Sequence, residues 1–133
     1  ALAERLALAG EAALFECMDA ADVEAFITTP WVMTGTDGVL NHPIHPRTYG
    51  AFAKYIEVYV NEKKALTFAE AVRKITSLPA DTFGLKDRGR LAKGYAADLV
   101  VMDLPRVKSP ADYTNPEIYP QGIEAVMIDG GWV

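Results

Sequence analysis

The hydrophobic pattern at the start of the chain predicts helices that alternate with short buried strands. Ala and Leu dominate the first residues and form helices readily, and Gly10 is a typical helix stop. Two later apolar runs are short and bounded by turn residues, as buried strands are. Asp19 can cap the helix between them, and Pro30 ends it. The predicted elements are a helix at 1–9, a strand at 12–18, a helix at 20–28 with Val23, Phe26 and Ile27 on its apolar face, and a strand at 31–34.

Strand, helix and strand joined by short loops form the repeating unit of a parallel α/β sheet or barrel. A loop rich in His and Pro follows, and beyond it apolar residues recur at helical spacing. Thr67 with Glu70 three residues later is typical of a capping box at a helix start. The predicted elements are a loop at 39–47, a helix at 49–63, a helix from Thr67 to about Ser77 with Val72 and Ile75 facing inward, and a helical turn from Pro79 that Gly84 closes.

From Arg88 onward glycines and prolines separate short apolar runs, which is typical of a small β structure. The predicted strands are 89–91, 97–103 and 123–129. The pattern therefore divides the chain into an α/β part at 1–84 and a small β part at 85–133.

Composition narrows the class of protein. Of the 133 residues, 50% are hydrophobic and 23% are charged, which is ordinary for a globular domain. The formal net charge of −5 argues against nucleic-acid binding, which needs clustered Lys and Arg. No apolar run reaches the roughly eighteen residues of a membrane span, and no signal peptide is recognisable.

Cys17 is the only cysteine, so the chain cannot form an internal disulfide. This fits a reducing compartment, and we expect a cytoplasmic protein. Because Cys17 lies in an apolar run, we expect an inert buried thiol rather than a nucleophile or metal ligand.

The strongest candidate for chemistry is Asp37, which follows the apolar run 31–34 and lies between Gly35 and Gly38. In α/β barrels the carboxyl ends of strands carry the active site. A carboxylate there can hold a divalent cation, or move a proton from a metal-bound water to a leaving amine. Asp-Gly is also a common tight-turn pair, and from the spacing alone both interpretations stay open.

Other polar residues follow in the loop. The planar guanidinium of Arg47 suits bidentate binding of a carboxylate, although a solvated or packing Arg is the commoner case. His42 and His45 only loosely match metal-ligand spacing, and we expect them to shape the loop.

Four stretches together resemble the C-terminal part of a metal-dependent amidohydrolase of the D-aminoacylase (N-acyl-D-amino-acid deacylase) group. The stretches are WVMTGTDG at 31–38, HPRTYG at 45–50, AVRKITSLPADTFGL at 71–85 and DRGRLAKGYAADLVVMD at 87–103, and the ending at 122–133 also fits. The glycine-rich stretch alone would indicate only the wider superfamily, which includes dihydroorotases and hydantoinases. The His-Pro-Arg stretch after Thr-Asp-Gly narrows the resemblance to the deacylases.

The resemblance implies a TIM-type (β/α)8 barrel with one or two zinc ions and a small β-sandwich. Residues 1–84 would supply the last two strands and helices of the barrel, with strand eight at 31–34, and residues 85–133 part of the sandwich. Asp37 would be a zinc ligand and the general acid/base, and Arg47 would bind the substrate's α-carboxylate. The parent enzyme would hydrolyse N-acyl-D-amino acids to a carboxylate and a D-amino acid.

The resemblance also implies that most of the machinery lies elsewhere. The family's His-x-His pair and its other metal ligands have no counterpart in this chain and would lie upstream of Ala1. We therefore expect the isolated chain to be inactive and to bind no zinc, or to bind it weakly. Its expected partners are a small N-acyl amino acid substrate and either the missing N-terminal part of the same protein or further copies of the chain, paired through strand edges.

Two alternatives remain open from the sequence. A cyclic-amide hydrolase of the dihydroorotase or hydantoinase kind would keep Asp37 but would not need Arg47. A non-catalytic structural or assembly module would need neither residue.

Overall fold

The computed structural model describes residues 17–40 and 42–133. The predicted helix at 1–9 and almost all of the predicted strand at 12–18 lie outside these residues. The helices are α2 (Ala20–Thr28), α3 (Arg47–Ile56), the π-helix η1 (Glu57–Glu62), α4 (Phe68–Ile75), α5 (Ser77–Phe83) and the short 3₁₀ helix η2 (Leu104–Arg106). The strands are β1 (Leu99–Met102), β2 (Ile123–Ile128) and β3 (Gly131–Trp132). Within the described ranges, no helix is both long and apolar enough to cross a membrane.

Helix α2 begins as the sequence predicts. The Asp19 side chain accepts hydrogen bonds from the backbone N–H groups of Ala21 (2.8 Å) and Asp22 (3.3 Å), which satisfies two donors of the first turn. Its predicted apolar face is confirmed only in part. Ile27 packs against the core, whereas the side chain of Phe26 is 64% exposed.

The predicted strand at 31–34 does not form in the described residues. Trp31 lies in a turn and is 77% exposed, and no strand forms over these residues. A β-strand needs backbone hydrogen bonds to a neighbouring strand, and no segment of the described residues pairs with residues 31–34. The backbone bonds instead to the C-cap of α2 and to α4: the N–H of Val32 donates to Thr29 O (3.1 Å), and that of Thr34 to Lys74 O (3.4 Å). The barrel part of the predicted fold is therefore not seen in the described residues.

The predicted helix at 49–63 is confirmed as α3 and η1, which run without a break from Arg47 to Glu62. Its apolar residues recur at helical spacing and form the centre of the core. The buried hydrophobic residues of this cluster are Ala53, Tyr55, Ile56, Val60, Leu66, Ala71 and Val107.

Helices α4 and α5 also follow local signals. The Thr67 hydroxyl accepts a hydrogen bond from the N–H of Glu70 (3.2 Å), which is the predicted N-cap. Gly84 ends α5 with a φ of 66°, a left-handed conformation that glycine adopts without strain. The predicted inward face of α4 is confirmed in part: Ile75 packs against the core and Val72 is half-buried, but the fully buried residues of the helix are Ala71 and Lys74.

The small β part forms an antiparallel sheet in the order β1-β2-β3. The predicted strands at 97–103 and 123–129 are confirmed, each somewhat shorter, while no strand forms at 89–91. The turn between β2 and β3 is made by Asp129 and Gly130, both with positive φ (50° and 83°), as a two-residue hairpin requires.

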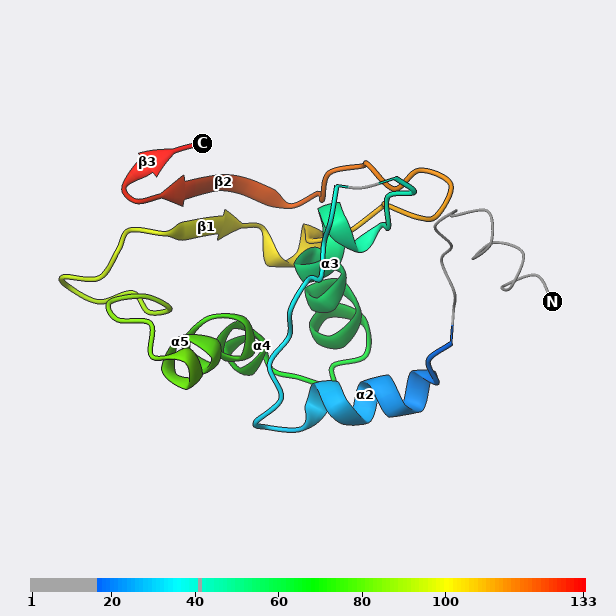
Figure 1. Cartoon of the computed structure of the whole chain (residues 1–133), viewed down its shortest axis with the longest axis horizontal. Helices are drawn as coiled ribbons and strands as arrows, with labels where there is room; N and C mark the ends of the chain where they lie inside the picture. Colours follow the sequence, from blue (N-terminus) through cyan, green and yellow to red (C-terminus); the bar gives the residue numbers. More distant parts are fainter. Residues whose placement is uncertain (1–16, 41) are drawn as a thin grey trace, which may run out of the picture.

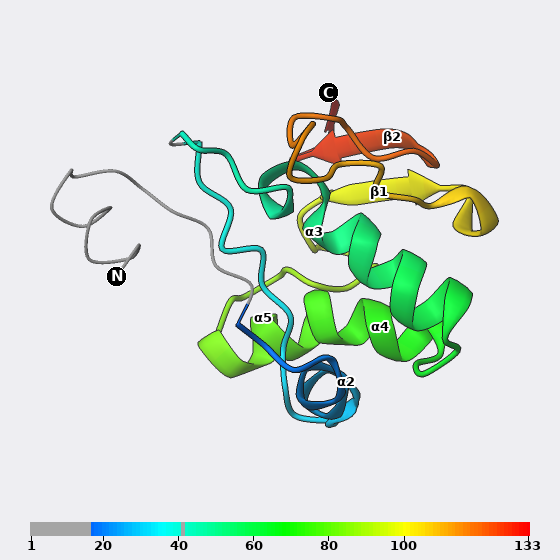
Figure 2. The same ribbon diagram turned by 90° about the vertical axis from the view of Figure 1, so that its right-hand side faces the viewer.

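Helix α3 lies between the sheet and the layer formed by α2, α4 and α5, as two perpendicular views show (Figures 1 and 2). Val107, from the connection between β1 and β2, is 2% exposed and belongs to the same cluster as Ala53 and Ile56. Residues from both predicted parts thus share one core, and the boundary between residues 84 and 85 stays a prediction.

Candidate functional site

Asp37 lies on the irregular segment between α2 and α3. Its side chain is 83% exposed, and its φ of 47° is left-handed, a region that Asp tolerates better than most residues but that still carries strain. Strained backbone is concentrated at turns and functional sites, so the conformation fits both interpretations of the Asp-Gly pair. The structure thus places the candidate carboxylate at the surface, facing solvent and α3.

The structure brings the two predicted site residues together. Arg47, the first residue of α3, places its Nη2 atom 2.8 Å from Oδ2 of Asp37. Its Nε atom also donates to the backbone carbonyl of Asp37 at 2.9 Å. The Arg47 guanidinium therefore binds both the side chain and the main chain of Asp37.

Close contact between the loop and α3 sets this arrangement. A side chain at Gly38 would place its Cβ 3.1 Å from Cα of Thr48, which is closer than ordinary van der Waals contact. Glycine at this position therefore allows the loop to lie directly against the backbone of α3. The Thr48 hydroxyl donates to the carbonyl of Val39 at 2.9 Å. Together these contacts hold the segment after Asp37 against the first turn of α3.

His45 supports Arg47 from the other side. Its Nδ1 atom accepts the backbone N–H of Arg47 at 3.0 Å, an N–H that the first turn of α3 leaves without a helical partner. This bond requires a neutral ring with its proton on Nε2, and Nε2 lies 3.2 Å from the hydroxyl of Tyr113. The two rings also pack edge to face with centroids 5.2 Å apart.

Burial lowers the pKa of His45 below 6.5, and the nearby positive charge of Arg47 lowers it further, while Asp37 opposes both. The neutral ring is therefore favoured near pH 7, in agreement with its role as an acceptor. The prediction that His45 shapes the loop is consistent with this geometry, and His42 is exposed.

The described residues do not fit a zinc site on their own. They contain no group of three or more His, Cys, Asp and Glu side chains that could hold a metal ion. A catalytic zinc takes three protein ligands and an open position, and Asp37 would supply one. The prediction of a buried Cys17 is wrong, because Cys17 is exposed.

Two residues near the site were not found from the sequence. Tyr113 reaches His45 from 68 positions away, and no local pattern marks it. Lys74 bonds to the segment that leads to Asp37, and a weak signal existed: it shares a helical face with Ala71, three positions earlier. A lysine on the apolar face of a helix is a sign of a buried polar contact.

Comparisons with known proteins identify the family. A family model described as the amidohydrolase family matches residues 2–133. The chain is 43% identical over 130 residues to the N-acyl-D-glutamate deacylase of Alcaligenes xylosoxydans xylosoxydans. This match covers 96% of this chain and 26% of that protein. It is 35% identical over 119 residues to the D-aminoacylase of the same organism, covering 89% of this chain and 25% of that protein.

Solved structures give the same result. The N-acyl-D-glutamate deacylase of Bordetella bronchiseptica, in complex with zinc and a phosphonate inhibitor that mimics the tetrahedral intermediate, matches with a TM-score of 0.85 and 37% identity. A crystal structure of D-aminoacylase also matches with a TM-score of 0.85, at 35% identity. Each match covers 87% of this chain and 25% of the other. The chain spans about a quarter of the length of these relatives, and it belongs to the amidohydrolase family, as a segment related to the N-acyl-D-amino-acid deacylases.

Proposed function

We propose that this chain is part of an N-acyl-D-amino-acid deacylase, to which it contributes a proton-transfer group, Asp37, and a substrate-binding group, Arg47. The observation that carries the proposal is the 2.8 Å contact between these two side chains, in a chain whose relatives are named as deacylases of this class. The substrate would be an N-acyl-D-amino acid, and the products a carboxylate and a D-amino acid.

Arg47 has the chemistry to bind a substrate carboxylate. Its planar guanidinium already holds one carboxylate, that of Asp37. A guanidinium has five N–H donors, and the contacts with Asp37 use two of them, which leaves capacity for a second carboxylate. The α-carboxylate that every N-acyl amino acid carries is such a group.

Asp37 has the chemistry to move a proton. Hydrolysis of an amide needs a base that takes a proton from the attacking water and an acid that returns one to the leaving amine. A single carboxylate can do both in sequence, since it gains the proton in the first step. Its exposure leaves room for a substrate amide beside it.

The metal and the barrel belong to a larger assembly in this proposal. The related B. bronchiseptica enzyme was solved with zinc, but the described residues of this chain do not form a zinc site alone. Ligands from other segments would have to complete one. We further propose that residues 31–34 form a barrel strand, the eighth, once a neighbouring strand from the rest of such an enzyme pairs with them. The isolated chain is then expected to show no deacylase activity.

The test uses the longest natural protein that carries this segment, with an N-acyl-D-glutamate as substrate. Asp37→Asn should lower kcat by about a hundredfold or more, because it removes the proton-transfer group but keeps the shape. Arg47→Ala should instead raise KM by roughly ten- to a hundredfold, since a hydrogen bond to a charged group contributes about 1.5–3 kcal/mol. Arg106→Ala, whose side chain is 72% exposed, is the matched control. An unchanged kcat in the Asp37 variant would refute the proposal, and an unchanged KM in the Arg47 variant would favour a cyclic-amide hydrolase.

A further inference from the structure

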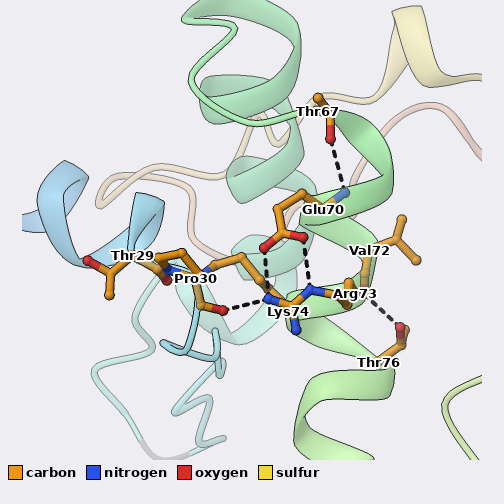
Figure 3. Close-up of polar contacts among 8 residues, drawn as sticks. All are labelled: Thr29, Pro30, Thr67, Glu70, Val72, Arg73, Lys74 and Thr76. Carbon is orange, nitrogen blue, oxygen red and sulfur yellow. Dashed lines mark hydrogen bonds and ion pairs between the residues drawn. The ribbon is translucent and has the colours of Figure 1, made fainter.

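Helix α4 holds the segment that leads from α2 to Asp37. Three backbone groups of this segment bond to two consecutive residues of α4, and Figure 3 draws Thr29 and Pro30 beside these two residues. Nζ of Lys74 donates to the carbonyl of Thr29 at 2.5 Å, and Nη2 of Arg73 donates to the carbonyl of Pro30 at 2.5 Å. The N–H of Thr34 donates to the carbonyl of Lys74 at 3.4 Å. In the absence of a paired strand, these contacts tie residues 29–34 to α4.

The lysine in this contact is buried. Lys74 is 0% exposed, which is rare for a lysine, and burial lowers its pKa. Thr29 is the C-cap of α2, where the backbone carbonyls carry partial negative charge, and the last turn of α2 has no basic residue of its own. Lys74 thus supplies, from α4, the positive charge that stabilises the end of α2.

The arginine is fixed as well. Glu70 binds the Arg73 guanidinium at two points, with Nε to Oε2 and Nη2 to Oε1 both at 2.8 Å (Figure 3). Glu70 itself lies in the first turn of α4, where Thr67 caps its N–H. The two contacts with Glu70 restrict the motion of the Arg73 guanidinium. The hydrogen bond from Arg73 therefore holds the carbonyl of Pro30 at a fixed position beside α4.

These anchors lie close to Asp37 along the chain. Asp37 follows Thr34 by three positions, so its Cα lies within about 11 Å of that of Thr34. At the other end, Nε of Arg47 holds the carbonyl of Asp37 at 2.9 Å. The segment is therefore fixed by α4 before Asp37 and by α3 at Asp37.

We propose that Lys74 and Arg73 are positioning residues that set where the Asp37 carboxylate lies, a role that rests on the function proposed above. Neither side chain needs to touch substrate. A displacement of about 1 Å at a reacting group can reduce a rate by roughly a hundredfold, so loss of these anchors should appear in kcat.

Lys74→Met is the test, in the longest natural protein that carries the segment. Methionine keeps the apolar stem and removes the charge, and the Thr29 carbonyl retains the N–H of Val32 (3.1 Å) as a partner. We expect kcat for an N-acyl-D-glutamate to fall by roughly ten- to a hundredfold with KM nearly unchanged. Lys54→Met, at a lysine whose side chain is 56% exposed on α3, is the matched control and should leave both constants as they are.

Hydrogen exchange gives a readout that does not depend on activity. In Lys74→Met the amide of Thr34 should exchange faster, while that of Ala71, bonded to Thr67 O at 3.0 Å within α4, stays protected. If Lys74→Met does not fold, Arg73→Lys replaces it, because a lysine keeps the charge but loses the two-point hold of Glu70.

The outcomes separate the two proposals. An active wild-type protein in which the variant keeps its kcat overturns the positioning role and leaves the proposed function standing. An inactive wild-type protein refutes the proposed function, and the exchange rate of Thr34 then decides the anchoring: faster exchange in the variant supports it, and unchanged exchange overturns it.

Discussion

The packing of Gly50 against Ser109 gives a quantitative test of how the β part is held beside the candidate site. Gly50 is buried in α3, and a Cβ at this position would lie 1.9 Å from Oγ and 3.0 Å from Cβ of Ser109. Ser109 is itself only 7% exposed and cannot move away freely. Gly50→Ala therefore forces the Ser109 side chain to rotate and the Ser109 backbone to shift.

Three effects decide the magnitude. Alanine gains about 0.8–1 kcal/mol over glycine within a helix. Overpacking of a filled site typically costs about 1–3 kcal/mol. The N–H of Ser109 donates to Oε2 of Glu57 at 3.1 Å, and loss of a hydrogen bond to a charged group costs about 1.5–3 kcal/mol more. The net expectation for Gly50→Ala is a loss of about 2–5 kcal/mol in the free energy of unfolding.

Urea unfolding followed by circular dichroism measures this loss. Gly35→Ala is the control, because nothing lies within 4 Å of a Cβ there, and it should change stability by less than about 0.5 kcal/mol. Ser109→Ala removes the colliding Oγ, so Gly50→Ala should cost less in that background, with a coupling of about 0.5–3 kcal/mol. Equal losses in the two backgrounds would refute the reasoning, since the contact with Oγ would then not be the cause.

Two further outcomes are expected. The lowered pKa of His45 means that the unfolded chain binds more protons between this pKa and 6.5, so the free energy of unfolding should fall on acidification through that window. Urea titrations from about pH 7 to about pH 5 should show this slope in the wild type and a smaller one in His45→Gln; equal slopes would contradict it. Thr67→Ala removes the N-cap of α4 and should cost about 1 kcal/mol, whereas the exposed Thr114→Ala should cost almost nothing, both by urea unfolding. A Thr67 loss no larger than that of Thr114 would show that the cap does not contribute.

The helices could be predicted from the sequence because their signals are local. Asp19 and Thr67 cap the N–H groups that directly follow them, and Gly84 ends α5 with its own backbone conformation. Each of these effects acts within about four residues and does not depend on the rest of the fold. The strand at 31–34 could not be predicted in the same way, because a strand needs a partner, and the described residues offer none.

The candidate site was predictable in its parts but not in its connections. Asp37 and Arg47 stood out as residue types in a suitable pattern, but the 2.8 Å contact between them depends on a left-handed turn and on the start of α3. Tyr113 lies in the connection between β1 and β2, and its position near His45 follows from the packing of that connection on α3. Contacts over such separations are set by tertiary packing, which no local pattern records.

The exposure of the Asp37–Arg47 pair bears directly on the proposed roles. With side chains 83% and 41% exposed, the two charges are largely solvated, and such a pair contributes only about 0–1 kcal/mol. A buried pair would instead cost about 3–5 kcal/mol when one partner is lost. Loss of this contact should therefore cost little stability. In the proposed roles Arg47 can keep its contact with Asp37, because the guanidinium donors that Asp37 does not use remain for a substrate carboxylate.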